Sequence, residues 1–180
     1  ARAQIYFVSL GLAYIGVELW FVPRFVLYLG HPSHALSVVL FSMLTASGVG
    51  SALSSRFVRS ARTISIVALC IVALLGLEWL ALPRIFDSTL NLAFPARVAI
   101  TVALVATPAV LMGMPFPSGL TLTTRTEGFV ARAWVLNGVA SVIASVGATL
   151  VAISNGFGAV LALAALCYGV AAFAVRGADS

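Results

Sequence analysis

Charge is scarce in this 180-residue chain: only 8% of its residues are charged, and lysine is absent. A soluble domain usually has about 25% charged residues. The hydrophobic share here is 62%, and the mean hydropathy is +1.13. These values exclude a water-soluble globular fold. Six membrane spans of about 20 residues each would use about 120 residues and leave about 60 for connections. No room remains within the chain for a separate soluble catalytic domain.

Catalytic and cofactor-binding motifs are missing as well. The sequence has no HExxH, CxxC or GxSxG motif and no acidic pair in a polar loop. The glycine-rich stretch at residues 48–51 lies inside an apolar run with no strand before it. That position argues against a phosphate-binding loop. We expect no catalysis by this chain alone, and no cofactor.

Cysteine and histidine are too few to predict a disulfide or a metal site. Cys70 and Cys167 each lie within an apolar run, where free cysteine behaves as a small hydrophobic residue. His31 and His34 flank a proline at a spacing that suits a metal or a tetrapyrrole. No cysteine or acidic residue nearby completes such a site, so we expect no bound metal.

Six apolar runs dominate the sequence. They predict spans at residues 4–22, 34–54, 63–82, 97–114, 133–154 and 158–175. Helices are expected, because lipid cannot satisfy the open edge of a strand. We expect helices to end at Pro23 and Pro83. We expect Pro115–Gly119 to be either the start of a loop or a re-entrant segment. The predicted fold is an all-α, polytopic membrane bundle that forms a single domain.

The ten positively charged residues, all arginine, predict the orientation of this bundle. With six spans, both termini share one side with the second and fourth connections. That side carries Arg2, Arg56, Arg59, Arg62, Arg125, Arg132 and Arg176, and the other side carries Arg24, Arg84 and Arg97. The positive-inside rule then places both termini in the cytoplasm. Arginines between apolar runs favour contact with anionic lipid, and we expect no nucleic-acid partner.

Small and weakly polar residues recur at helical spacing in two runs. Asn137, Ser141, Ser145 and Thr149 repeat every four residues in the fifth run, and Ala46, Gly50 and Ser54 in the second. Such residues let membrane helices approach closely and hydrogen-bond across the contact. We therefore predict that Gly50, Ser141 and Ser145 pack helices together. The alternative is that the same hydroxyl groups line a substrate path.

Glu18 is the leading candidate for a functional intramembrane residue, since ionisable groups inside spans are costly and rare. It is expected near the outer end of the first span, either in an ion pair with Arg24 or in a proton- or cation-handling role. Together with His31 and Asn137, these two residues form our candidate polar site.

A short repeat links Glu18 to a second acidic residue. The pattern of Glu, four apolar residues and Pro-Arg that begins at Glu18 recurs 60 positions later at Glu78. Seven residues do not by themselves establish a duplication. Because Pro83 is read as a helix end, Glu78 is also expected close to the end of its span, and it is the weaker candidate.

Several short stretches resemble a known family. They are Glu18 followed by Arg24-Phe25, Leu29–Pro32, Val38–Leu40, Ser47–Ser51, Gly113–Leu120, Trp134 with Asn137-Gly138, Ala140–Val142, Gly156-Phe157 and Tyr168. In this order they resemble the C-terminal membrane domain of bacterial spermidine-synthase-like integral membrane proteins. The resemblance implies an aminopropyltransferase- or methyltransferase-like domain before Ala1 and a place in the bacterial inner membrane. Pro23 departs from the family, which tends to have glutamine before the arginine.

These observations lead to one expected function and two alternatives. The chain is expected to act as a non-catalytic membrane anchor or scaffold, with lipids and another protein domain or subunit as partners. The first alternative is an accessory subunit of a larger energy-transducing or photosynthetic membrane complex. The second is a small transporter of a cationic or amine-like solute, with Glu18, Arg24 and Asn137 near its pathway.

Overall fold

In the computed structural model, residues 2–123 and 128–176 are described, and they contain helices but no strand. The helices are α1 (Arg2–Leu29), α2 (Pro32–Phe57), α3 (Ala61–Thr89), α4 (Phe94–Met112), α5 (Pro115–Thr123), α6 (Phe129–Asn155) and α7 (Phe157–Arg176). Six segments are long and apolar enough to cross a membrane, and α4 with α5 makes one of them, Phe94–Leu122. The prediction of an all-α, polytopic membrane bundle is therefore confirmed.

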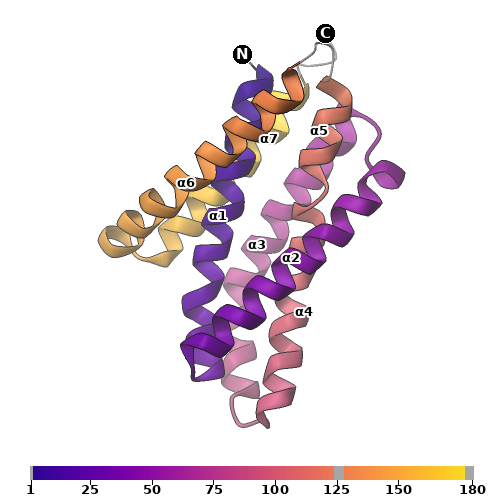
Figure 1. Cartoon of the computed structure of the whole chain (residues 1–180). Coiled ribbons are helices and arrows are strands. Elements are labelled where there is room, and N and C mark those ends of the chain that lie inside the picture. The colour runs from indigo at the N-terminus through magenta and orange to yellow at the C-terminus, as the bar shows by residue number, and fades with distance from the viewer. Residues whose placement is uncertain (1, 124–127, 177–180) are drawn as a thin grey trace.

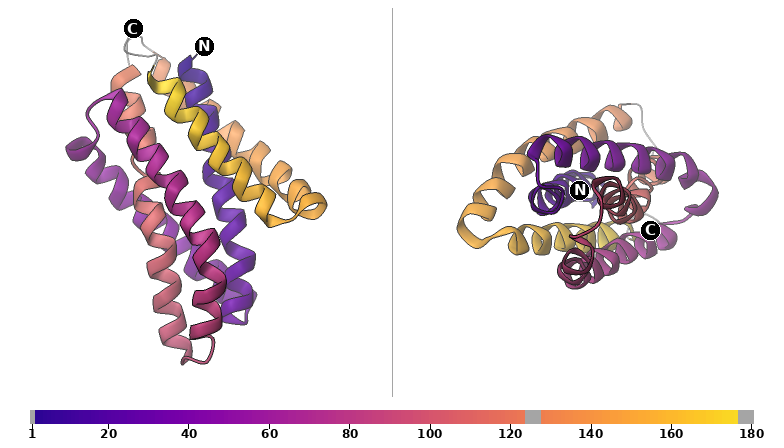
Figure 2. Two further views of the ribbon diagram at one scale, coloured as in Figure 1. Left: turned by 180° about the vertical axis from the view of Figure 1, so that it is seen from behind. Right: turned by 90° about the horizontal axis from the view of Figure 1, so that it is seen from below.

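The helix α1 lies at the centre of the bundle (Figure 1). It packs against α2, α6 and α7, and its buried side includes Phe7, Ala13, Val17, Trp20 and Phe25, none of which is exposed. The helix α7 packs against both α1 and α3. The hairpin of α6 and α7 slants away from the other helices, and its turn lies partway along α1 (Figures 1 and 2). The first residues of α1 and the last of α7 lie at the same end of the bundle.

Prolines within the first and third spans do not end their helices, and that prediction was wrong. α1 continues through Pro23 to Leu29, and α3 continues through Pro83 to Thr89. A proline removes one backbone hydrogen bond. Ending the helix inside lipid would leave several backbone groups unsatisfied, so continuing it costs less. Glu18 and Glu78 consequently lie 11 residues before their helix ends, about 16 Å along the axis.

The segment Pro115–Gly119 is helical, so the prediction of a loop or re-entrant segment was also wrong. It opens α5, which follows α4 after a break at Gly113 and Met114 and completes the same span. Proline is well suited to the first turn of a helix, where its missing N–H needs no partner. The Tyr6 hydroxyl on α1 donates a hydrogen bond of 2.6 Å to the Pro115 carbonyl and ties α5 to the bundle.

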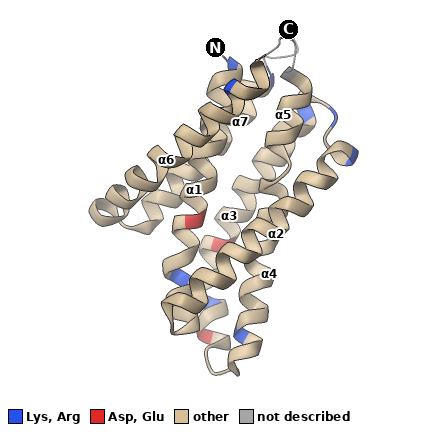
Figure 3. Cartoon of the chain, in the orientation of Figure 1, with Lys and Arg blue, Asp and Glu red and all other residues tan. Residues whose placement is uncertain are grey.

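Arginines gather towards the two ends of the bundle, and two acidic positions lie between them, while a third lies at the end away from the termini (Figure 3). The end with the termini carries Arg2, Arg56, Arg59, Arg62, Arg132 and Arg176, and the other end carries Arg24, Arg84 and Arg97. Arg125 is outside the described residues. The helix order thus separates the arginines as the sequence predicts.

Candidate functional site

The four predicted polar residues are spread along α1 and do not form one site. The Asn137 side-chain amide on α6 donates to the Phe7 carbonyl at 3.1 Å. Glu18 lies 11 residues beyond Phe7, about 16 Å further along the helix. The Arg24 guanidinium stacks on the Trp20 ring, 4.5 Å from its centroid, instead of pairing with Glu18. His31 lies beyond the end of α1.

The two histidines make only ring contacts. The imidazoles of His31 and His34 are 5.1 Å apart, and His34 also lies 5.1 Å from the ring of Phe94. Within residues 2–123 and 128–176, no group of three histidine, cysteine or acidic side chains is placed to hold a metal ion. This pair therefore has an aromatic environment and no further metal ligands in that part of the chain.

Of the three predicted packing residues, two lie at helix contacts. A Cβ atom added to Gly50 would be 1.8 Å from the Val110 carbonyl oxygen of α4. The Ser141 hydroxyl lies 2.9 Å from the Asn137 carbonyl and 3.4 Å from the Gly11 carbonyl of α1. Ser145 is exposed and bonds only within its own helix, to the Val142 carbonyl, so the prediction that it packs helices together within the bundle was wrong. The predicted row of polar residues on α6 comprises Asn137, Ser141, Ser145 and Thr149. Only its first two members contact α1, because α6 slants away from the bundle (Figure 1).

A cleft of about 410 Å³ lies among α1, α2, α6, α7 and the junction of α4 with α5; most of its lining is apolar, and we call it the polar cleft for the hydroxyl and amide groups within it. Its polar lining residues are Tyr14, Ser47, Ser51, Asn137, Ser141 and Tyr168, and Phe116 and Trp134 add aromatic surface. The Tyr14 and Ser47 hydroxyls lie 3.2 Å apart and join α1 to α2. Sequence reasoning found Asn137 and Ser141 but missed the two tyrosines, because an isolated tyrosine in an apolar run carries no positional signal. The cleft offers hydrogen bonds without charge.

Glu18 brings the nearest carboxylate to this cleft. It lies four positions after Tyr14, so the two side chains share a face of α1. Glu18 itself is partly buried. A cationic group entering beside Tyr14 would therefore come close to a negative charge.

Two helices hold Glu18 and Glu78 at the same depth. Phe25 and Phe86 make an edge contact at 5.4 Å between centroids, and the Tyr28 hydroxyl lies 2.7 Å from Thr89 Oγ1. Both pairs join residues 61 positions apart on helices that run in the same direction. The offset nearly equals the 60 positions of the sequence repeat. The two acidic segments accordingly lie at similar depth on α1 and α3 (Figure 3).

The second helix of each hairpin continues this correspondence. α2 and α4 also run in the same direction, with Gly50 against Val110 and His34 against Phe94, both 60 positions apart. The hairpins α1–α2 and α3–α4 therefore lie side by side with an offset close to the 60 positions of the sequence repeat. This arrangement gives the short sequence repeat a structural counterpart over four helices.

Glu78 is more deeply buried than the sequence predicted. Its side chain is only 7% exposed. In the described part of the chain, no donor lies within hydrogen-bonding distance of its Oε2 atom. The misplaced helix end at Pro83 hid this burial, and the repeat with Glu18 was the one signal that could have revealed it.

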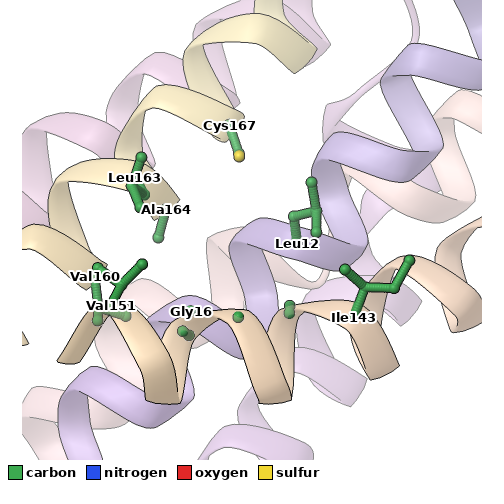
Figure 4. A pocket seen from close by; sticks show the side chains of 11 residues that line it. Leu12, Gly16, Ile143, Val151, Val160, Leu163, Ala164 and Cys167 are labelled. Atoms are coloured by element: carbon green, nitrogen blue, oxygen red, sulfur yellow. The ribbon is translucent and has the colours of Figure 1, made fainter. Parts of the chain in front are cut away.

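A second pocket of about 280 Å³ lies among α1, α6 and α7 (Figure 4). Apart from the Cys167 thiol, its side chains are aliphatic, and Gly16 and Gly147 leave room between the helices. Leu12 and Ile143 lie across the pocket from Leu163 and Cys167 (Figure 4). The pocket offers no polar group to orient a solute, so it suits only an apolar chain.

Comparison of the chain with protein-family models, with curated proteins and with solved structures finds no match in any of the three. The resemblance to spermidine-synthase-like membrane domains therefore stays a prediction from the sequence. The structure itself establishes the helical fold of a multi-pass membrane protein.

Proposed function

We propose that the chain is a membrane scaffold domain that holds a synthase-like domain or a partner subunit at a bacterial inner membrane, with both termini in the cytoplasm. The observation that carries this proposal is the outer face of α6. This helix has 27 residues, but only Ala133, Ala140 and Ala144 are buried within the bundle. The other side of the helix is free for a partner.

The exposed face of α6 has the pattern of a helix–helix contact. Val135, Gly138, Val142 and Ser145 are all exposed and follow one another at intervals of three and four residues. This spacing keeps the two valines, the glycine and the serine in one stripe along the helix, with Gly138 and Ser145 as its small members. Small residues in a stripe allow close packing of a second helix, whereas lipid contact alone needs no such order.

The short connections support a role without extramembrane chemistry. The helices within each described stretch are joined by one to four residues. Such connections hold no loop long enough to build an active site in water. The arginines at the end with the termini, where the positive-inside rule expects them, support a cytoplasmic position for both termini.

Site-specific photo-crosslinking tests the scaffold proposal. With a photoreactive residue in place of Val142, which is 67% exposed on α6, we expect one protein adduct in high yield from native membranes. The matched control is Phe41 on α2, which is 71% exposed and should give lipid adducts only. Equal, lipid-only labelling at both positions would remove the support for a partner on α6.

The same experiment separates the scaffold from the accessory-subunit alternative. A crosslink to a domain of the same polypeptide leaves the mass of the polypeptide unchanged and appears as a joined peptide pair. A crosslink to a separate subunit adds the mass of a second chain. The first result favours the synthase-like scaffold, and the second favours the accessory subunit.

Transport of an amine-like cation is the second candidate function, and the polar cleft favours it. The cleft adjoins a span that is broken at Gly113 and Met114 and has Glu18 one helical turn from Tyr14. Broken helices at membrane depth are typical of substrate sites in transporters.

Removal of the Glu18 charge tests transport directly. In proteoliposomes loaded for uptake of a labelled aliphatic diamine, Glu18→Gln is expected to lower the initial rate at least about tenfold, because losing one ion pair at low dielectric costs more than 1.4 kcal/mol. Asp87→Asn, which changes an exposed carboxylate on α3, is the control and should keep the rate. Uptake that is equal in both variants would exclude a role for Glu18 in transport.

A further inference from the structure

Three buried polar groups in the half of the bundle away from the termini have no hydrogen-bond partner. They are Glu78 Oε2 on α3, Trp20 Nε1 on α1 and the Ser42 hydroxyl on α2, and no partner for them is found among the residues that the structure describes. Trp20 and Ser42 are 0% and 4% exposed. Buried polar groups in proteins are nearly always paired. The fourth such atom, Arg97 Nε, belongs to a side chain that already donates through Nη1 to the Tyr28 carbonyl.

The three unpaired groups lie at one depth in the bundle. The register of α1 and α3 places Glu78 level with Val17, one turn from Trp20. The contact of Tyr14 with Ser47 between antiparallel helices places Ser42 level with Leu19. One turn of helix rises about 5.4 Å. All three groups therefore fall within about one turn of each other along the bundle axis.

We propose that these groups form an intramembrane proton site centred on the Glu78 carboxyl. The carboxyl binds and releases the proton. No direct hydrogen bond joins the three groups, so the Trp20 indole N–H and the Ser42 hydroxyl supply hydrogen bonds to the carboxyl through bound water. A carboxyl group without such partners would be costly at this depth when charged. The proposal concerns α1–α3 and is independent of the partner surface on α6.

The donor set favours a proton over a metal cation. Hard cations such as calcium take about six to eight oxygen ligands. The two Glu78 oxygens and the Ser42 hydroxyl supply at most three, and the indole N–H can only donate. An N–H group beside the carboxylate stabilises negative charge but repels a cation. The ligand that fits these groups is a proton, together with water.

Few other titratable groups face this site. Glu18 on α1 is the nearest acid, at similar depth, and Arg24 brings a positive charge to the Trp20 ring. α2 carries no titratable side chain between His34 and Arg56, and the described part of α5 carries none. On α4 the titratable residue is Arg97 near its start, and on α7 Cys167 and Tyr168 lie closer to the other end of the bundle. A pH response at this depth can therefore be assigned to the carboxyl groups of Glu18 and Glu78.

Labelling with dicyclohexylcarbodiimide tests the site, because this apolar reagent reacts with protonated carboxyl groups inside membranes. The full chain in lipid vesicles is labelled from about pH 4 to about pH 9, which brackets an ordinary and a strongly shifted carboxyl group. Peptide mass spectrometry then locates the adduct. We expect an adduct on Glu78 that decreases at least tenfold across this range and is absent in Glu78→Gln. A constant yield, or no adduct on Glu78, overturns the proposal.

Two indole variants test the hydrogen bond. Trp20→Phe removes the N–H but keeps an aromatic ring, and the labelling of Glu78 at neutral pH should rise several-fold because the carboxylate loses a donor. Trp79→Phe is the matched control, since Trp79 is the neighbour of Glu78 on the exposed face of α3, and its labelling should equal that of the unmodified chain. Equal labelling in both variants would overturn the assignment of Trp20. Photo-crosslinking through α6 should be unchanged in Glu78→Gln, which separates this test from that of the scaffold.

Discussion

Gly50→Ala is expected to destabilise the bundle by about 3 kcal/mol, the upper part of the range for overpacking. The added Cβ would lie 1.8 Å from the Val110 carbonyl oxygen and 2.8 Å from its carbon. Both atoms belong to backbone, so no side-chain rotation can relieve the clash. α2 and α4 would have to separate along much of their contact. Thermal unfolding in mild detergent, followed by circular dichroism, measures the change.

Gly48→Ala is the matched control for this prediction. Gly48 lies two residues away on the same helix, and no atom lies within 4 Å of the position of its Cβ. Alanine also has the higher helix propensity. This variant should be as stable as the unmodified chain or slightly more stable. Equal loss of stability in both variants would show that α2 and α4 do not meet at Gly50.

A second glycine tests whether the clash belongs to one interface. A Cβ at Gly113 would lie 2.0 Å from the Ser47 carbonyl oxygen, one turn from Gly50 on α2. Both substitutions push the same two helices apart, and neighbouring effects are not additive. The double variant should therefore lose less stability than the two single losses together. Purely additive losses would indicate two separate contacts.

Gly50 also shows what the sequence could predict. Small residues at helical spacing within an apolar run indicated a close helix contact, and the structure places a backbone carbonyl against Gly50. The same pattern was wrong at Ser145, because spacing identifies a face of a helix and not the length over which a neighbour follows it. That length depends on the angle at which α6 leaves α1, which only the packing of the other helices determines.

The candidate site was predicted less well than the fold, for a related reason. Composition and run length suffice for six spans, since the bilayer imposes the helix and its length. The depth of Glu78 depends on whether Pro83 ends a helix, and that choice depends on the surroundings of the proline. Lipid and neighbouring helices leave the chain no better alternative than to continue. Local rules from water-soluble proteins therefore placed both glutamates too near the surface.

Tyr28→Ala has the second large expected effect, a loss of about 3 kcal/mol, the lower end for removal of a buried aromatic side chain. Tyr28 is 1% exposed, its ring stacks on Phe86 at 4.4 Å between centroids, and its hydroxyl contacts Thr89. We expect the lower end of that range because the helices remain in an apolar medium when the protein unfolds in detergent. The Tyr28 ring therefore stabilises the bundle through packing and not through transfer out of water. The readout is again thermal unfolding in detergent.

Two further variants show whether the ring of Tyr28, its hydroxyl group or merely a substitution at this end of α1 accounts for the loss of stability. Tyr28→Phe keeps the stack and should cost about 1 kcal/mol or less, since Thr89 Oγ1 still bonds the Ile85 carbonyl. Leu27→Ala, at a neighbouring position that is 82% exposed, should leave stability unchanged. If the three variants were equally stable, the aromatic contact would not be what holds α1 against α3.

This contact also links stability to the proposed proton site. The pairs of α1 with α3 at Phe25, Tyr28 and Phe86 fix the register that brings Trp20 level with Glu78. When Tyr28→Ala loosens that register, the indole N–H should move from the carboxyl, and labelling of Glu78 at neutral pH should rise as it does in Trp20→Phe. Tyr28→Phe should label like the unmodified chain. A Tyr28→Ala protein that loses stability but keeps normal labelling would show that Glu78 does not depend on the register of these helices.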